Sequence, residues 1–148
     1  MKSTSMVSKN KMTDVFLDTG YVLALVNQRD ENHQKAQELA GQIISEEVPV
    51  VTTQAVLTEI GNALAHPQNR PRAISNIEEL RTSPDATVVP SLDDLFQRGL
   101  ALYKEREDKS WGLTDCISFV VMREQGIRDA LAHDEDFEQA GFNALLRE

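Results

Sequence analysis

Short runs of apolar residues alternate with longer segments of helical periodicity along this chain. The apolar runs lie at residues 15–17, 48–51, 87–89, 130–132 and 142–146. The helical patterns cover residues 31–46 and 54–65, about ten residues that end at Thr82, a segment that starts near Ser91, and residues 113–125. Strands that alternate with helices form parallel sheets covered on both faces. The sequence therefore predicts an α/β fold with three layers, a doubly wound, mostly parallel sheet of four to five strands.

Three of the predicted helices show recognisable ends or faces. Segment 31–46 begins after a capping residue, either Asp30 or Asn32, and Gly126 suits the end of helix 113–125. Ser91 resembles an N-cap for the helix that follows it. The apolar stripe of segment 31–46 contains Ala36, Leu39, Ala40, Ile43 and Ile44. The side chains expected to face inward after Ser91 are Leu92, Leu95, Phe96, Leu100 and Tyr103.

The length of 148 residues fits one domain. We expect residues 13–148 to form that domain and residues 1–12 to be a flexible N-terminal tail, with Met12 as an alternative start to Met1. No apolar run approaches the roughly 20 residues of a membrane span, so we expect no membrane association. A single cysteine, Cys116, excludes an internal disulfide and a cysteine-rich zinc site, which favours a cytoplasmic protein.

The chain carries a net charge of −9, from 15 basic and 24 acidic residues. Proteins that bind nucleic acid without a cofactor neutralise phosphates with Lys and Arg. This chain has no broad basic surplus for that purpose. Any role on nucleic acid therefore requires a local basic patch or a bridging cation.

Four acidic residues stand where the carboxyl edge of such a sheet is expected, which is where open α/β sheets bind ligands. Asp18 and Asp134 each close an apolar run. Asp115 opens the helical segment 113–125, and Glu59 lies beside the apolar stripe of segment 54–65. Each also has an ordinary interpretation: a helix cap for Asp18, a charge at a helix N-terminus for Asp115, a solvated side chain for Glu59 and a turn for Asp134. Their joint placement favours a site.

Four carboxylates in one cleft repel one another. At about 4 Å and an effective dielectric constant near 20, each pair costs on the order of 4 kcal/mol before relaxation. Protons or a cation must therefore neutralise the group. Oxygen donors select hard cations such as Mg²⁺ or Mn²⁺, and the chain has no histidine or cysteine set that suits zinc. Such an ion activates water and neutralises a phosphodiester, and it provides the positive field that the chain lacks.

The segments that carry these acids resemble, in order and spacing, the motifs of the PIN domain family. The resemblance spans roughly residues 13–146. The matching segments are Val15-Phe16-Leu17-Asp18-Thr19-Gly20, Thr58-Glu59-Ile60-Gly61-Asn62-Ala63-Leu64, Leu113-Thr114-Asp115-Cys116-Ile117-Ser118 and Ala130-Leu131-Ala132-His133-Asp134-Glu135-Asp136-Phe137. One departure is Ala132, where many members carry Thr or Ser before the last acid.

The resemblance implies a metal-dependent ribonuclease, such as a toxin of the VapC type, acting on RNA. It makes the four acids (Asp18, Glu59, Asp115, Asp134) the catalytic and metal-binding residues, with Mg²⁺ or Mn²⁺ as cofactor. It gives Thr19 and Thr114 the role of orienting water or carboxylates. Asp136 is either an auxiliary ligand or a turn residue, and the turn is slightly favoured. An antitoxin protein and a homodimer are implied partners.

Substrate contacts are less marked in the sequence. Arg70 and Arg72 make the loop after the Glu59 helix locally basic and are candidates to hold phosphates, although an ordinary polar loop is the commoner case. Trp111 could stack a base but more often such a residue fills a core. Three functional alternatives remain: a PIN-like binding module without catalysis, a structure-specific DNA nuclease, and a receiver-type phosphoryl-transfer domain. The last ranks low, because no lysine follows the fourth apolar run.

Overall fold

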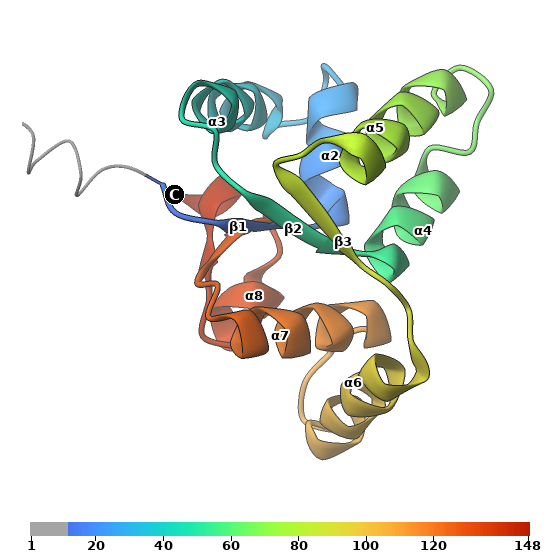
Figure 1. Cartoon of the computed structure of the whole chain (residues 1–148), viewed down its shortest axis with the longest axis vertical. Helices are drawn as coiled ribbons and strands as arrows, with labels where there is room; N and C mark the ends of the chain where they lie inside the picture. The colour runs from blue at the N-terminus through green and yellow to red at the C-terminus, as the bar shows by residue number, and fades with distance from the viewer. Residues whose placement is uncertain (1–11) are drawn as a thin grey trace, which may run out of the picture.

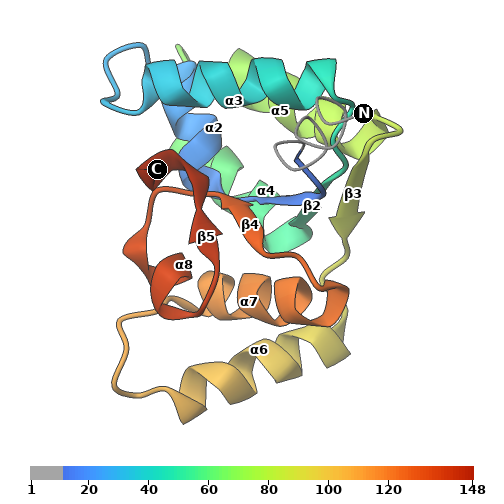
Figure 2. The same cartoon turned by 90° about the vertical axis from the view of Figure 1, so that its left-hand side faces the viewer.

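The computed structural model describes residues 12–148, and the expectations for residues 1–11 lie outside the described residues. Five parallel strands form one sheet in the order β3-β2-β1-β4-β5 (Figures 1 and 2). The strands are β1 Val15–Leu17, β2 Val50–Thr53, β3 Ala86–Val89, β4 Asp129–Leu131 and β5 Asn143–Ala144. The predicted parallel sheet is therefore confirmed. The division into a tail and a domain at residue 13 stays a prediction.

Helices cover both faces of this sheet. They are α2 Thr19–Val26, α3 His33–Ser45, α4 Gln54–Ala63, α5 Arg70–Thr82, α6 Asp93–Glu105, α7 Leu113–Gln125 and α8 Glu135–Gln139, followed by the 3₁₀ helix η1 Leu145–Arg147. Figures 1 and 2 show α2, α3 and α5 on one face and α7 and α8 on the other. Helix α6 lies outside α7, away from the sheet (Figure 2). The predicted three-layer architecture is confirmed.

The core lies on both faces of the sheet, and one part of it lies between the central strand and α7. Val15 and Phe16 of β1 have no exposed surface, and the same holds for Phe119 of α7. Phe119 meets the rings of Trp111 and Phe137 edge to face, with centroids 5.0 Å apart in each pair. Such contacts add roughly 0.5–1.5 kcal/mol per pair to the burial itself. Trp111 is thus a core residue.

Helix α6 approaches α7 closely at Gly99. A methyl group at this position would lie 2.4 Å from Cγ1 of Ile117, so only glycine fits. Leu95 and Leu102 are buried on the same side of α6. The helix begins one residue later than expected, with Leu92 and not Ser91 as its N-cap.

The prediction of which side chains of α6 face inward is wrong in part. Leu92, Phe96 and Tyr103 are 63%, 43% and 48% exposed. The physical reason is that α6 packs mainly against α7, so its apolar residues exceed the area that α7 can cover. The predicted burial of Ile44 is also wrong. This residue lies in the last turn of α3 and is 77% exposed.

Other differences concern element boundaries. Helices α2 and α8 were not predicted, because α2 is apolar around much of its circumference and α8 has only five residues. Helix α5 starts at Arg70, so the loop expected at residues 66–72 is shorter. Segment 142–146 forms only a two-residue strand before η1. Gly126 ends α7 in the left-handed conformation, with φ of 69°, as predicted.

Within residues 12–148, no helix is long and apolar enough to cross a membrane.

Candidate metal centre

The chain turns from β1 into α2 at Asp18, at the carboxyl edge of the sheet. The backbone N–H of Asp18 donates to the carbonyl of Leu131 on β4 (3.2 Å), and the Thr52 hydroxyl donates to the carbonyl of Leu17 (2.8 Å). Both neighbouring strands therefore fix the end of β1. Asp18 occupies the N-cap position of α2, but its side chain makes no capping hydrogen bond and is free for another role.

Glu59 reaches the same edge from α4. This helix begins where the Thr53 hydroxyl accepts a hydrogen bond from the backbone N–H of Val56 (3.1 Å). The hydroxyl of Thr19 donates to Oε1 of Glu59 over 2.6 Å. A residue of the first motif thus orients the carboxylate of the second, which is the kind of contact predicted for Thr19.

Asp115 lies in the first turn of α7. Its Oδ2 accepts a hydrogen bond from the backbone N–H of Gly112 over 3.3 Å, so the side chain also caps the helix. Thr114, predicted to orient the site, uses its carbonyl to accept a hydrogen bond from the Ser118 hydroxyl (3.0 Å). The structure gives its hydroxyl no role at the site.

Asp134 and Asp136 complete the acidic group at the end of β4. Asp134 caps α8, with Oδ1 accepting from the backbone N–H of Asp136 over 3.0 Å. Asp115, Asp134 and Asp136 each place a carboxylate oxygen within 4.8 Å of the others. Asp136 therefore belongs to a capped turn and also lies among the acids.

All four predicted acids line one open cleft of about 530 Å³. Its lining residues are Asp18, Thr19, Gly20, Leu23, Glu59, Asp115, His133, Asp134, Glu135 and Arg147. Sequence reasoning missed Glu135 and Arg147. Glu135 is a neighbour of Asp134 and could have been found on that ground, whereas Arg147 follows no motif and is brought in by the last turn of the chain.

Burial and mutual repulsion shift the proton affinity of these acids. Burial raises the pKa of Asp18 to about 7 from an ordinary value of 3.8. This pKa includes the raising effect of the carboxylates of Asp115, Glu59 and Asp134, which is smaller than that of burial, and the lowering effect of a hydrogen bond from the backbone of Thr19. Only 8% of Asp18 is exposed, so its charged form pays a full desolvation cost.

Asp115 shows the same effect to a smaller degree. Its pKa is raised to about 6, first by burial and then by the carboxylates of Asp134, Glu59 and Asp136, while the hydrogen bond from Gly112 lowers it. The pKa of Asp136 is also raised, first by burial and then by neighbouring acids. The cleft thus holds acids that need either protons or a cation near neutral pH.

The donor set fits a hard divalent cation. Among the described residues, the group with metal-binding spacing consists of carboxylates alone. Mg²⁺ and Mn²⁺ prefer oxygen ligands of this kind, whereas zinc sites use histidine and cysteine. The raised pKa values of Asp18 and Asp115 indicate that a cation would relieve an existing electrostatic cost.

The two arginines predicted to hold substrate are engaged elsewhere. Arg70 donates from Nε and Nη2 to the carbonyl of Ala65, at 3.1 and 2.9 Å. Arg72 donates from Nη1 to the carbonyl of Val26 over 2.9 Å. Both guanidinium groups thus bind carbonyls at the ends of α4 and α2, and neither lines the acidic cleft. A substrate role for them stays an untested prediction.

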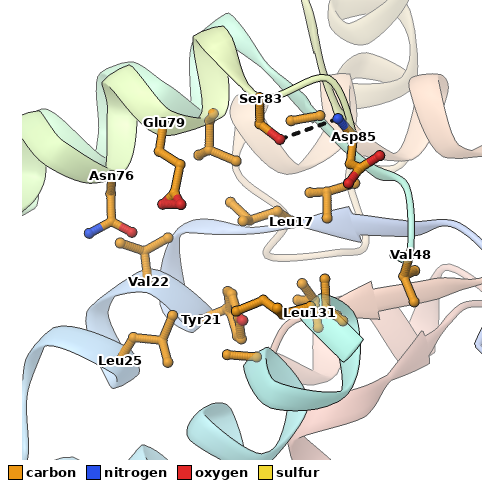
Figure 3. Close-up of a pocket in the computed structure, with 16 residues that line it drawn as sticks. Leu17, Tyr21, Val22, Leu25, Val48, Asn76, Glu79, Ser83, Asp85 and Leu131 are labelled. Atoms are coloured by element: carbon orange, nitrogen blue, oxygen red, sulfur yellow. Dashed lines mark hydrogen bonds between the residues drawn. The ribbon is translucent and has the colours of Figure 1, made fainter. Parts of the chain in front are cut away.

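A second hollow, of about 280 Å³, lies between α2, α3, α5 and the sheet (Figure 3). Its lining is mainly apolar, including Leu17, Val22, Leu25, Val48 and Leu131. Asn76, Glu79, Ser83 and Asp85 supply its polar groups. Figure 3 shows these polar side chains along one side, with the α2 side chains opposite.

Comparison with known proteins agrees with the geometry. The model of the PIN domain family matches residues 15–143. Two curated relatives, from two strains of Mycobacterium tuberculosis, are 30% identical over 128 residues, which cover 86% of this chain and 95% of each relative; both are described as 23S rRNA-specific endonuclease VapC20. The crystal structure of Mycobacterium tuberculosis VapC20, a sarcin-ricin loop cleaving toxin, matches with a TM-score of 0.76 at 30% identity, over 87% of this chain and 96% of that one.

Proposed function

The chain belongs to the PIN domain family, and from that premise we propose that it is a metal-dependent endoribonuclease that hydrolyses RNA phosphodiester bonds. The observation that carries this proposal is the convergence of Asp18, Glu59, Asp115 and Asp134 from four separate segments into one cleft. Structural needs alone do not explain this arrangement, because burying like charges together destabilises a fold.

The acids would hold Mg²⁺ or Mn²⁺, with Asp18, Asp115, Asp134 and Glu59 as ligands and Asp136 as an added ligand. Such an ion, when bound, acidifies water and stabilises the charge that develops on the phosphate. Thr19 fixes one oxygen of Glu59 by its 2.6 Å hydrogen bond. The other oxygen of Glu59 is then available to accept a proton from the attacking water.

The proposed substrate is a structured ribosomal RNA. The relative VapC20 is described as specific for 23S rRNA and as cleaving the sarcin-ricin loop. The match covers 86% of this chain and 95% of the relative, and the family match over residues 15–143 includes all four acids of the cleft. We therefore propose the sarcin-ricin loop as the RNA on which this chain acts, as the toxin of a toxin–antitoxin pair.

A cleavage assay tests the proposal directly. A labelled sarcin-ricin-loop hairpin is incubated with wild type and with Asp18→Asn, in Mg²⁺, in Mn²⁺ and in EDTA. We expect cleavage by the wild type in either metal and a return to background in EDTA and with Asp18→Asn. Equal cleavage by both proteins, or cleavage in EDTA, would contradict the proposed metal-dependent mechanism.

The same design separates the alternatives. A protein that binds Mn²⁺ in calorimetry and loses that binding with Asp115→Asn, yet cuts no RNA in a panel of structured RNAs, is a binding module. A protein that cuts a DNA hairpin of the same sequence and leaves the RNA intact is a DNA nuclease. Both results would contradict the proposed ribonuclease.

We also propose a homodimer and an antitoxin partner. The support for the dimer is the apolar stripe on α6, in which Leu92, Phe96 and Tyr103 lie on one side of the helix and are exposed. We expect Phe96→Asp to convert the dimer into a monomer in light scattering after gel filtration, with Gln97→Asp as a control. A monomeric wild type would contradict the dimer.

The support for the antitoxin is the acidic cleft, which suits a basic side chain.

A further inference from the structure

Arg147 is the cationic side chain of the acidic cleft. Of the Lys and Arg residues in the described part of the chain, it alone is among those that line the cleft. It lies in η1, the last turn of the chain, which packs beside β4 through the hydrogen bond from the backbone N–H of Leu146 to the carbonyl of Ala132 (3.1 Å). The C-terminal turn thus carries a positive charge to a site otherwise lined by carboxylates.

The guanidinium of Arg147 is held by two protein groups. Its Nε pairs with Oε1 of Glu138 on α8 over 2.9 Å, and its Nη1 donates to the carbonyl of His133 over 3.3 Å. A guanidinium has five N–H donors, so these contacts use only part of its capacity. Within residues 12–148, the hydrogen bonds give Nη2 no acceptor, and the side chain is 35% exposed.

The remaining donors are available to bind a phosphate. With Nε on Glu138 and one N–H of Nη1 on the His133 carbonyl, the second N–H of Nη1 and both N–H groups of Nη2 have no acceptor among the described residues. Paired N–H groups of a guanidinium bind two oxygens of one phosphate, and the planar group is held rigid by its protein contacts. His133, whose carbonyl fixes Nη1, is the chain neighbour of Asp134, so these donors lie next to the acids.

The negative charge of the cleft explains why a fixed cation is needed to bind RNA there. Five carboxylates line the cleft, and the whole chain carries −9, so an RNA strand approaches a negative surface. A divalent cation would offset only part of this charge. A fixed cation beside the acids supplies attraction for a phosphate that the metal-binding residues cannot supply.

We propose that Arg147 binds a backbone phosphate of the RNA beside the bond that is cut, and thereby positions the substrate over the acids. This inference rests on the proposed ribonuclease function and assigns one of its substrate contacts. The residue acts on binding of RNA, and the acids act on the reacting phosphate. Its loss therefore weakens RNA binding and leaves metal binding unchanged.

The test compares Arg147→Met and Arg147→Lys with wild type. Binding of a fluorescein-labelled sarcin-ricin-loop hairpin is measured by anisotropy in Ca²⁺ over a range of salt, and Mn²⁺ binding is measured by calorimetry. We expect Arg147→Met to weaken RNA binding about tenfold and to reduce the slope of log K against log salt by about 0.7–0.9, the share of one phosphate contact. Arg147→Lys recovers much of this, and the Mn²⁺ isotherm stays that of wild type.

Glu138→Ala is the matched control, because it removes the ion pair and keeps the cation. If Arg147 only fastens η1 to α8, Glu138→Ala and Arg147→Met will weaken RNA binding alike and lower the thermal midpoint alike. We expect instead that Glu138→Ala binds RNA at least as well as wild type. Equal weakening by the two variants, or an unchanged salt slope in Arg147→Met, overturns the proposal.

The failure of this inference and of the proposed function are distinguishable. A wild type that binds the hairpin without cutting it in Mn²⁺ contradicts the ribonuclease, while the binding data on Arg147→Met still decide the phosphate contact. A wild type that cuts the hairpin while Arg147→Met binds it unchanged contradicts only the phosphate contact. A wild type that neither binds nor cuts the hairpin overturns both.

Discussion

Two hollows lie against the same helix, and they differ in almost every physical property. The acidic cleft meets α2 at Thr19, Gly20 and Leu23, whereas the apolar hollow meets it at Val22 and Leu25. The end of β1 contributes to both hollows. Its last residue, Leu17, lines the apolar hollow, and the next residue, Asp18, lines the cleft. One turn of chain thus separates a region of like charges from a region of hydrocarbon.

The difference shows where this fold gains stability and where it loses it. Apolar side chains around the hollow gain roughly 25 cal/mol for each Å² removed from water. The acids of the cleft lose free energy on burial, which is why the pKa values of Asp18 and Asp115 are raised. We expect changes in the cleft to alter metal binding and pH dependence, and changes in the hollow to alter stability alone.

The largest expected effect is the pH dependence of the metal-free protein. The pKa of Asp18 is about 7 in the folded chain and 3.8 ordinarily, so between these values the folded state holds a proton that the unfolded state has released. The free energy of unfolding therefore falls as pH rises from about 4 to about 7, by on the order of 4 kcal/mol for this group. Urea unfolding in EDTA at a series of pH values measures this.

Two variants make the comparison between the hollows explicit. Asp18→Asn should reduce the pH dependence, since an amide does not titrate, and leave the part that Asp115 contributes. Asp85→Asn, at the exposed edge of the apolar hollow, should leave it as in the wild type. Saturating Mn²⁺ should raise the midpoint of the wild type most at neutral pH, where the acids are ionised. A wild type whose stability in EDTA is constant from pH 4 to 7 would contradict the electrostatic account of the cleft.

The next effect concerns the hydrogen bond from Thr19 to Glu59. Thr19→Val keeps the shape of the side chain and removes the hydroxyl that orients Oε1 of Glu59. Partners of metal ligands are typically worth about 10- to 100-fold in affinity or activity, so we expect a loss of this size in Mn²⁺ affinity by calorimetry. Thr58→Val, on an exposed turn of α4, is the control and should bind Mn²⁺ as the wild type does.

The smallest effect is expected in the apolar hollow. Val22 is 1% exposed, and Val22→Ala removes two methyl groups from its lining. We expect a loss of about 1–2 kcal/mol in the free energy of unfolding, measured with urea, and no change in the Mn²⁺ isotherm. A clear drop in Mn²⁺ affinity would show that the two hollows are coupled through α2 and would break the proposed separation.

The sequence predicted the cleft better than it predicted the helix that divides the two hollows. Asp18, Asp115 and Asp134 could be found because each stands at the end of an apolar run or the start of a helix, and parallel strands bring such positions to one edge. Helix α2 could not be found by periodicity, because it is covered by the sheet, α3 and α4 and carries apolar residues on several sides.

The remaining errors have equally specific causes. The stripe of Leu92, Phe96 and Tyr103 has the spacing of a buried helix face, but periodicity does not reveal which neighbour covers a helix. Arg147 carries no local signal, because its place in the cleft depends on the path of the chain after β5. Contacts made by the tertiary fold, and not by a motif, were thus the part that sequence reasoning missed.

The strand order has a consequence for the timing of synthesis. Because β1 lies between β2 and β4, the acid that follows the first strand meets Asp134 only after the chain has been synthesised beyond β4. A nascent or truncated chain that ends before residue 134 lacks the last segment of the acidic group. The acidic group is therefore completed only after the segment that contains Asp134 has been synthesised.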